Sequence, residues 1–390
     1  MALTVGIIGL PQSGKTSLFN ALTQSGAPIS GYATSTVQAN RAVVEVPDER
    51  LGRLAEIFHP RKVVPTTVEF VDVAGIGQAS DETRKQGLSP EFLGHIRNAD
   101  ALAIVVRCFA NAAAPHPAGS VNAGRDLDEL LGELALTDLA TVERRIESTG
   151  RKAKSGDKKV IEELTFLKRV REALESGEPV SQQDFSGLEQ AALRDLFLLT
   201  MKPRFYVANV SEDALGAAGA LIARAGMGAP TETPPAAGEL ACVGTTLARA
   251  RAEGTEIAAV SAKLEAELGE LPPEDAAEYL GALGLPALGA ERVIQTGYTA
   301  LNLISFLTAG EDEVRAWTVT RGSKAPAAAG KIHSDFERGF IRAEVVHYDD
   351  LMAAGGAMKT ARERGQVRLE GKDYVVRDGD IIEFRFNVSK

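Results

Sequence analysis

Residues Gly9 to Thr16 read Gly-Leu-Pro-Gln-Ser-Gly-Lys-Thr and match the phosphate-binding pattern GxxxxGK[ST] at every fixed position. They follow the apolar run Leu3 to Ile8, and a helical apolar pattern comes after them. A strand that passes into a helix through such a loop is typical of an α/β domain with an anion site at the helix N-terminus. An ordinary glycine-rich turn is the alternative, and the flanking strand and helix disfavour it.

Each part of this loop suits phosphate chemistry. Gly14 permits close approach of the backbone, Lys15 supplies positive charge to the β- and γ-phosphates, and the Thr16 hydroxyl is a ligand for Mg²⁺. The sequence therefore predicts a set of nucleotide contacts in the loop: Gln12, Ser13, Gly14, Lys15, Thr16 and Ser17.

The composition is that of a soluble globular chain of two or three domains. It has 390 residues, of which 44 % are hydrophobic and 25 % charged, and no apolar run approaches the ~18 residues that span a bilayer. We expect no membrane association and a cytoplasmic location. The two cysteines, Cys108 and Cys242, lack CxxC spacing and are expected to be structural or incidental.

Apolar β-branched runs alternate with helical patterns, which favours a mostly parallel sheet with helices on both faces. From about 126 to 199 the pattern changes to long helices broken at Ser155-Gly156-Asp157, which indicates an inserted helical hairpin. Ala214 to Gly254 is rich in Ala, Gly and Pro, with a Pro-rich run at Gly228 to Pro235, and part of it is expected to be an irregular surface excursion. A helical stretch should cover Pro273 to Phe306, and the Asp378-Gly379 turn predicts a β-hairpin.

The net charge of −10 argues against a protein coated by nucleic acid, but the charge is uneven. The segment from Val142 to Arg171 contains ten basic residues and five acidic residues. The hairpin turn, Arg151 to Lys159, is therefore a candidate contact for RNA. A solvated helix face is the alternative.

Two further motifs fit the phosphate loop. Asp72-Val73-Ala74-Gly75 follows a predicted strand, where the aspartate would hold Mg²⁺ and the Gly75 N–H would meet the γ-phosphate. Thr36 lies in the polar stretch where a switch threonine closes on the metal. We therefore predict Thr16, Thr36 and Asp72 as metal ligands. On its own, Thr36 reads as a loop threonine.

Asn209-Val210-Ser211-Glu212 occupies the place of the guanine-reading NKxD motif. Val210 replaces the lysine and Glu212 is one methylene longer than aspartate, so bidentate guanine recognition should be lost and adenine favoured. Ser261 and Ala262 follow another strand as the second base-contacting loop. The alternative for residues 209–212 is an ordinary strand exit.

With these motifs in place, the chain resembles the Obg-like ATPases, the YchF family of the translation-factor branch of P-loop GTPases. The matching strings run through nearly the whole chain, and the two C-terminal ones are the most discriminating: Gly9 to Thr16, Pro65 to Gly75, Val105 to Phe109, Asn209 to Glu212, Val314 to Thr318, Ala328 to Glu337 and Glu370 to Tyr374.

The resemblance implies a P-loop NTPase domain with a mostly parallel sheet, an inserted α-helical hairpin and a C-terminal α+β TGS domain. The corresponding segments are 1–125 and 200–305 for the P-loop domain, 126–199 for the hairpin and 306–390 for the TGS domain. It further implies a Mg²⁺-dependent ATP-binding and hydrolysing switch that associates with the ribosome and RNA through the hairpin tip and TGS domain. We expect a monomer.

The family carries an apolar residue, here Ile76, where other switch proteins have a water-orienting glutamine. His116 matches the family histidine proposed to position the attacking water, so the predicted catalytic residues are His116, Lys15 and Gly75. Gln78 is an alternative for this task. Gln12-Ser13 replaces the usual Asn-Val, whose asparagine helps coordinate potassium in related enzymes, so the resemblance alone does not imply potassium activation for this chain.

Two other functions stay open from the sequence. One is a nucleotide-gated RNA- or ribosome-binding module with negligible turnover, and the other is a GTPase in which the backbone and the Ser261 loop restore guanine binding.

Overall fold

The structure is a computed structural model that describes residues 3–24, 40–73, 90–177, 180, 183–226, 237–269, 271–283, 285 and 288–387. Its contacts divide the chain into two compact units. The P-loop unit comprises Leu3–Ala42 and Glu69–Val293, and the C-terminal unit comprises Val43–Val68 together with the chain from Ile294 onward. Among the described helices, none is long and apolar enough to cross a membrane.

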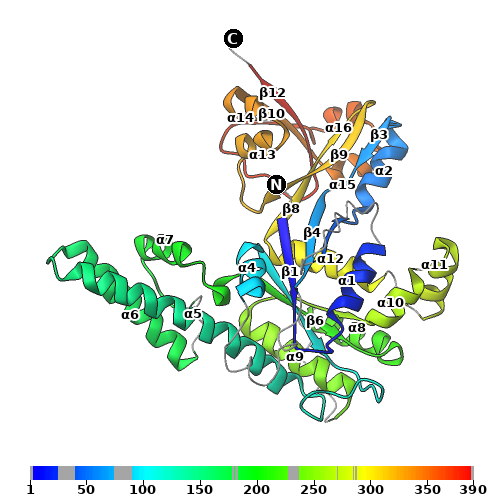
Figure 1. Cartoon of the computed structure of the whole chain (residues 1–390). Helices are drawn as coiled ribbons and strands as arrows, with labels where there is room; N and C mark the ends of the chain where they lie inside the picture. Colours follow the sequence, from blue (N-terminus) through cyan, green and yellow to red (C-terminus); the bar gives the residue numbers. More distant parts are fainter. Residues whose placement is uncertain are drawn as a thin grey trace. The chain divides into compact units, whose positions relative to one another are not determined.

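One six-stranded sheet has the order β2-β4-β1-β5-β6-β7 (Figure 1). Its strands are β1 (Leu3–Ile8), β2 (Asn40–Glu45), β4 (Thr67–Asp72), β5 (Ala101–Arg107), β6 (Arg204–Asn209) and β7 (Ile257–Val260). The pairs β1–β5, β5–β6 and β6–β7 are parallel. Strand β5 is buried at every position, as expected for a central strand of a parallel sheet with both faces covered. The predicted α/β class is confirmed.

The helices of the P-loop unit pack on this sheet or form the insertion: α1 (Lys15–Gln24), α4 (Pro90–Asn98), α5 (Ala123–Ala153), α6 (Lys158–Ser176), α7 (Gly187–Leu196), the short turn η2 (Leu199–Met201), α8 (Glu212–Gly226), α9 (Glu239–Glu253), α10 (Ala262–Leu268) and α11 (Pro273–Ala282). Helix α12 (Gly289–Ala300) leads out of the unit. Leu127 and Leu130 of α5 join the main core beside the sheet.

The helical hairpin forms as its apolar spacing predicts. Helices α5 and α6 lie side by side (Figure 1) and bury Val142, Leu167 and Val170 between them. The hairpin turns at residues 154–157, and the Asp157 side chain caps α6 by accepting a hydrogen bond from the Lys159 N–H.

The Pro-rich run from Gly228 to Pro235, for which an irregular excursion is expected, lies outside the described residues. The described residues on either side of it are mostly helical. Helices α8 and α9 contain most of them, and α9 buries Val243, Leu247 and Ala250 against the sheet. Alanine is the strongest helix former, so Ala-rich composition here reports helix rather than loop. The helical expectation for residues 273–306 fails at its end, because β8 (Leu303–Ala309) is a strand.

The C-terminal unit contains a second six-stranded sheet of order β11-β10-β12-β8-β9-β3. Its remaining strands and helices are α2 (Glu49–Phe58), β3 (Lys62–Val64), β9 (Glu313–Thr320), α13 (Ala325–Ile332), α14 (Ser334–Arg338), β10 (Phe340–His347), α15 (Tyr348–Ala353), α16 (Met358–Glu363), β11 (Arg368–Glu370) and β12 (Asp380–Phe386). The unit thus takes α2 and β3 from near the start of the chain. Leu51 and Leu54 of α2 are buried with Leu307 and Val314.

The predicted β-hairpin around Asp378-Gly379 does not form. Residues 374–376 bond instead to residues 323–325, through Ala325 N–H to the Tyr374 carbonyl and Val376 N–H to the Ser323 carbonyl. The Asp378 carboxylate accepts a hydrogen bond from the Ser305 N–H and forms an ion pair with Arg50. Long-range partners therefore override a local turn signal.

Candidate nucleotide site

The phosphate loop begins where β1 ends, and its backbone is fixed by glycine. Gly14 has φ +95°, and a Cβ there would stand 2.2 Å from Asn209 Nδ2. A Cβ on Gly9 would stand 2.6 Å from the Val105 carbonyl oxygen. Both positions therefore require glycine, as the motif predicts. Gln12 and Ser17 lie at the surface of the loop, whereas Ser13 is buried.

The Lys15 side chain folds back over the loop. Its ammonium donates to the Gly9 carbonyl at 3.0 Å and the Leu10 carbonyl at 2.8 Å, and the residue is 7 % exposed. Burial lowers the pKa of Lys15 to about 8, against the opposing attraction of Asp72. An anion in the loop would relieve this penalty by supplying the missing negative charge.

The structure brings together Thr16 and Asp72, two of the three residues predicted as metal ligands. The Thr16 hydroxyl donates to Asp72 Oδ2 at 3.1 Å, and Asp72 Oδ1 is buried without a hydrogen-bond partner in the described structure. Burial raises the pKa of Asp72, partly offset by the Thr16 hydrogen bond and by Lys15. An unpartnered carboxylate oxygen beside a hydroxyl fits Mg²⁺, which takes a few protein oxygens and completes its shell with phosphate and water. A cluster of three His, Cys, Asp or Glu that could hold a metal is absent from the described residues.

Asn209 joins the phosphate loop to the second base loop. Its Nδ2 donates to the Ser13 carbonyl at 2.9 Å, and its Oδ1 accepts from the Ala262 N–H at 3.0 Å. All three residues are buried. The predicted residues Ser13, Asn209 and Ala262 therefore come together from three separate strand ends.

The rest of the base motif divides between core and surface. The Val210 side chain belongs to the hydrophobic core, and Ser261 is buried. The Ser211 N–H donates to Glu239 Oε2 at 2.7 Å, and the Glu212 carboxylate accepts from the Tyr279 hydroxyl at 2.5 Å. Neither Glu239 nor Tyr279 could be predicted from the sequence as a partner of the base loop, because no motif spacing connects either residue with it.

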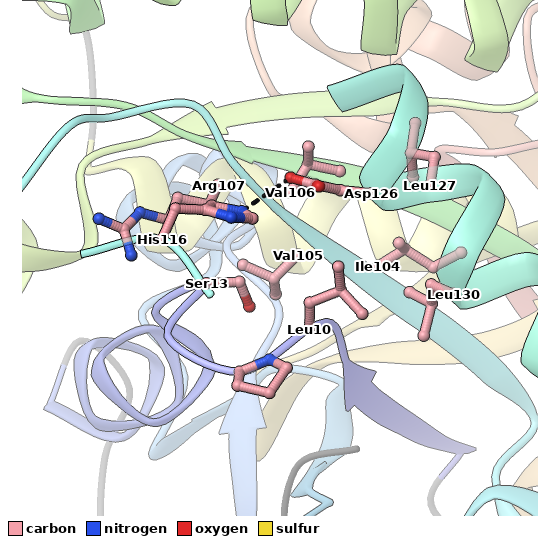
Figure 2. Close-up of a pocket in the computed structure, with 11 residues that line it drawn as sticks. Leu10, Ser13, Ile104, Val105, Val106, Arg107, His116, Asp126, Leu127 and Leu130 are labelled. Atoms are coloured by element: carbon pink, nitrogen blue, oxygen red, sulfur yellow. Dashed lines mark hydrogen bonds and ion pairs between the residues drawn. The ribbon is translucent and has the colours of Figure 1, made fainter. Parts of the chain in front are cut away.

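His116 lies buried against the phosphate loop (Figure 2). Its side chain is 5 % exposed, its Nε2 is 3.0 Å from Asp126 Oδ2, and its Nδ1 accepts from the Ala118 N–H at 3.1 Å. Because Nδ1 accepts, the ring proton sits on Nε2 and is donated to Asp126. The cavity between His116 and Leu10, Pro11 and Ser13 measures about 10 Å³, at the lower limit for one water.

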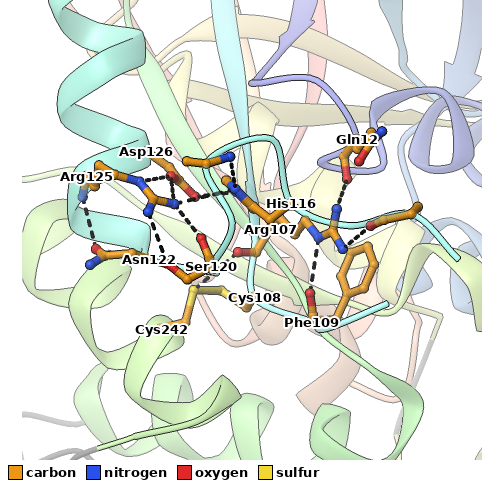
Figure 3. Close-up of polar contacts among 12 residues, drawn as sticks. Gln12, Arg107, Cys108, Phe109, His116, Ser120, Asn122, Arg125, Asp126 and Cys242 are labelled. Carbon is orange, nitrogen blue, oxygen red and sulfur yellow. Dashed lines mark hydrogen bonds and ion pairs between the residues drawn. A yellow bond between two sulfur atoms is a disulfide. The ribbon is translucent and has the colours of Figure 1, made fainter. Parts of the chain in front are cut away.

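Arg107, at the end of β5, fastens the loop that carries His116 (Figure 3). Its guanidinium donates to the carbonyls of Phe109, Gln12 and Ala114, at 3.1, 3.4 and 2.7 Å. Burial lowers the pKa of Arg107, opposed by the negative charge of Asp126. Arg107 therefore bridges the phosphate loop and the His116 loop.

Cys108 and Cys242 form a disulfide that joins the end of β5 to α9 (Figure 3). Their expected structural role agrees with this pairing, but the sequence did not pair them. They are 134 residues apart, and short-range spacing carries no signal at that separation.

Three of the predicted site features cannot be placed. Thr36, Gly75 and the Ile76–Gln78 stretch lie outside the described residues.

The phosphate loop connects a strand to a helix, and an asparagine turn and a second base loop lie at the same edge of the sheet. These features define a P-loop nucleotide-binding protein of the GTPase type. A protein of Bacillus subtilis (strain 168) named Ribosome-binding ATPase YchF is 45 % identical over 388 residues, covering 100 % of both chains. The chain belongs to the YchF family.

Other comparisons agree. A protein of Escherichia coli O157:H7 with the same name is 42 % identical over 388 residues and covers 100 % of both chains. A solved structure of the Schizosaccharomyces pombe YchF GTPase superimposes with a TM-score of 0.80 at 34 % identity, covering 98 % of this chain and 97 % of that one. The model of the YchF GTPase C-terminal family, described as a protein of unknown function, matches residues 303–387, and that of the 50S ribosome-binding GTPases matches residues 4–147.

Proposed function

We propose that this protein is a Mg²⁺-dependent ATP-binding and hydrolysing switch that associates with the ribosome in the cytoplasm. The observation that carries the proposal is the pairing of Thr16 with Asp72, whose second carboxylate oxygen is buried and has no hydrogen-bond partner among the described residues. Lys15 and Asp72 also attract each other electrostatically. Relatives aligned over the full length are named ribosome-binding ATPases, which supports both halves of the proposal.

In this function the phosphate loop binds and orients the triphosphate. Lys15, which here donates to the Gly9 and Leu10 carbonyls, would contact the β- and γ-phosphates, and Thr16 and Asp72 would supply oxygen ligands to Mg²⁺. Bound Mg²⁺ supplies neutralisation of the charge on the phosphate oxygens. His116 orients the attacking water once its ring leaves Asp126, and in-line attack gives ADP and phosphate.

Adenine preference is supported by the base loop. The Glu212 carboxylate already accepts a hydrogen bond from Tyr279, and the Val210 side chain faces the core. A guanine edge would need an acceptor free for two hydrogen bonds.

A GTPase is the second candidate, favoured by the description of the S. pombe relative as a GTPase. Equilibrium titration with labelled ATP and GTP, each with Mg²⁺, separates the two. We expect ATP to bind at least tenfold tighter, about 1.4 kcal/mol. Tenfold tighter GTP binding would reject the adenine assignment. The Tyr279→Phe variant removes the hydrogen bond to the Glu212 carboxylate, and it should reduce the difference in affinity between ATP and GTP.

We also propose the hairpin turn as a contact for ribosomal RNA. Its five cations are exposed, and within the described structure none forms an ion pair: Arg151, Lys152, Lys154, Lys158 and Lys159. Unpaired exposed cations on a projecting turn suit a phosphate backbone. The C-terminal TGS-like domain would be the second contact, the whole acting as a monomer.

Charge reversal tests the hairpin. Changing Lys152, Lys154 and Lys158 to Glu should weaken ribosome binding at least tenfold and flatten its dependence on salt concentration. The matched control reverses three exposed cations farther from the turn, Arg144, Lys168 and Arg194, and should have a smaller effect. Co-sedimentation with ribosomes over a salt series measures both. Equal losses in the two triple variants would assign the effect to overall charge.

A further inference from the structure

The His116 ring is held by the first turn of α5. The Asp126 side chain is 7 % exposed, and its Oδ2 accepts a hydrogen bond from His116 Nε2–H. Its Oδ1 accepts from Arg125 Nη2 at 2.7 Å and Nε at 3.0 Å. Arg125 also donates to the Ser120 carbonyl at 2.5 Å and hydroxyl at 3.2 Å. One helical turn thus fastens the His116 loop at two places (Figure 3).

This turn is itself well anchored. Asn122 caps α5 by accepting from the Arg125 N–H at 3.1 Å, and a carboxylate in the first turn is stabilised by the helix dipole. Ring, carboxylate and guanidinium therefore form a closed set of hydrogen bonds in which both ring nitrogens are used. In this arrangement His116 has no lone pair or proton left for a water molecule.

The other end of α5 is the basic hairpin turn. The helix runs without a break through 31 residues, about 46 Å at 1.5 Å per residue. Its buried residues extend from Ala123 to Thr149. One continuous helix therefore connects Arg151 and Lys152 at the hairpin turn with Asp126 beside His116.

We propose that Asp126 is a positioning residue that holds His116 away from the reaction, and that α5 releases this hold when the hairpin turn binds a polyanionic partner such as ribosomal RNA. The inference rests on the proposed function and adds its regulation. The two states are a ring bonded to Asp126 and Ala118, as described here, and a ring free to orient water. A partner that binds the second state better raises its population.

Phosphate release from ATP, measured with and without purified ribosomes, tests the proposal. Asp126→Ala should raise the ribosome-free rate about 10-fold, as expected for losing a hydrogen bond to a charged group, and should reduce the stimulation by ribosomes. Asp126→Asn should lie between it and wild type, because an amide oxygen accepts less strongly. ATP affinity should change less than twofold in both variants.

Two further variants tie the effect to the ring. The double variant His116→Ala with Asp126→Ala should fall to the rate of His116→Ala alone. The control, Asp128→Ala, removes a carboxylate from the same turn that is 69 % exposed and bonded to Arg249, and it should behave like wild type.

A measurement that does not depend on ATP hydrolysis distinguishes release of the His116 loop from a folding defect. In hydrogen-exchange mass spectrometry, the peptide holding the Ala118 N–H should exchange faster in Asp126→Ala and in wild type bound to ribosomes, while α9 peptides stay unchanged. Acceleration across the whole P-loop unit would indicate unfolding and reject the proposal.

The outcomes separate this proposal from the proposed function. If Asp126→Ala lowers hydrolysis to the His116→Ala rate with ATP binding intact, Asp126 orients the ring for catalysis and the proposal is overturned. Unchanged ribosome-free and stimulated rates overturn it too. If wild type and His116→Ala release phosphate equally with ribosomes, the catalytic assignment of His116 fails instead.

Discussion

The Lys15→Met variant is expected to bind ATP about 10- to 100-fold more weakly, while its fold stays intact. A charged hydrogen bond to phosphate contributes roughly 1.5–3 kcal/mol, and methionine keeps the length of the side chain without the charge. Isothermal titration with Mg²⁺-ATP measures the loss. The control Lys168→Met, an exposed lysine of the hairpin, should bind ATP as wild type does.

The pH dependence of stability and of ATP binding provides a second test of the role of Lys15. The folded-state pKa of Lys15, about 8, lies below the ordinary value of 10.5, so its charge disfavours folding below about pH 8. This penalty is relieved as pH rises from about 8 toward 10.5, because the folded protein has then already lost the proton. ATP binding near pH 8 to 9 should take up a proton, visible as a dependence of the binding enthalpy on the buffer. Lys15→Met should show neither effect, and proton uptake that persists in it would contradict the assignment.

The Asn209→Ala variant is expected to lose about 2–6 kcal/mol of unfolding free energy, together with its nucleotide affinity. The substitution leaves the Ser13 carbonyl and the Ala262 N–H buried without their partner, at roughly 1–3 kcal/mol each. It also unties the phosphate loop from the second base loop. Urea unfolding followed by circular dichroism measures the stability.

Asn209→Asp is the matched control for this change. The carboxylate can still accept from Ala262 but has no donor for the Ser13 carbonyl, which it would repel. We expect a phosphate-loop defect with the Ser261 loop retained, detectable as faster hydrogen exchange in residues 9–14 alone. Wild-type stability in Asn209→Ala would show that the two hydrogen bonds contribute little.

The phosphate loop, the hairpin and the strand ends could be predicted because each depends on local pattern. Gly9 and Gly14 are required by the backbone, Leu127 and Leu130 repeat at helical spacing, and Asp157 caps the helix it precedes. Asn209 could be placed at the end of a strand for the same reason, and it ends β6. These signals act over a few residues and are read directly from the sequence.

The parts that escaped prediction depend on distant partners. Arg107 donates to the Gln12 and Ala114 carbonyls, the Glu239 carboxylate accepts from the Ser211 N–H, and Asp126 accepts a hydrogen bond from the His116 ring. The Asp378-Gly379 turn failed for the same reason, since Tyr374 bonds to Ala325 rather than across the turn. Only the folded chain brings these groups together.

The composition of the C-terminal unit affects how deletions should be interpreted. Strand β3 pairs with β9, and Leu51 and Leu54 of α2 are buried with Leu307 and Val314, although the chain between them runs through the P-loop unit. A chain cut before β8 would expose both leucines, at roughly 1.5–3 kcal/mol each, and leave β3 without its neighbour. Removing residues 303–387 is thus not the removal of a separable module. A loss of ribosome binding after such a cut would report damage to the remaining chain as much as a missing contact surface, so point substitutions are the sounder way to map that surface.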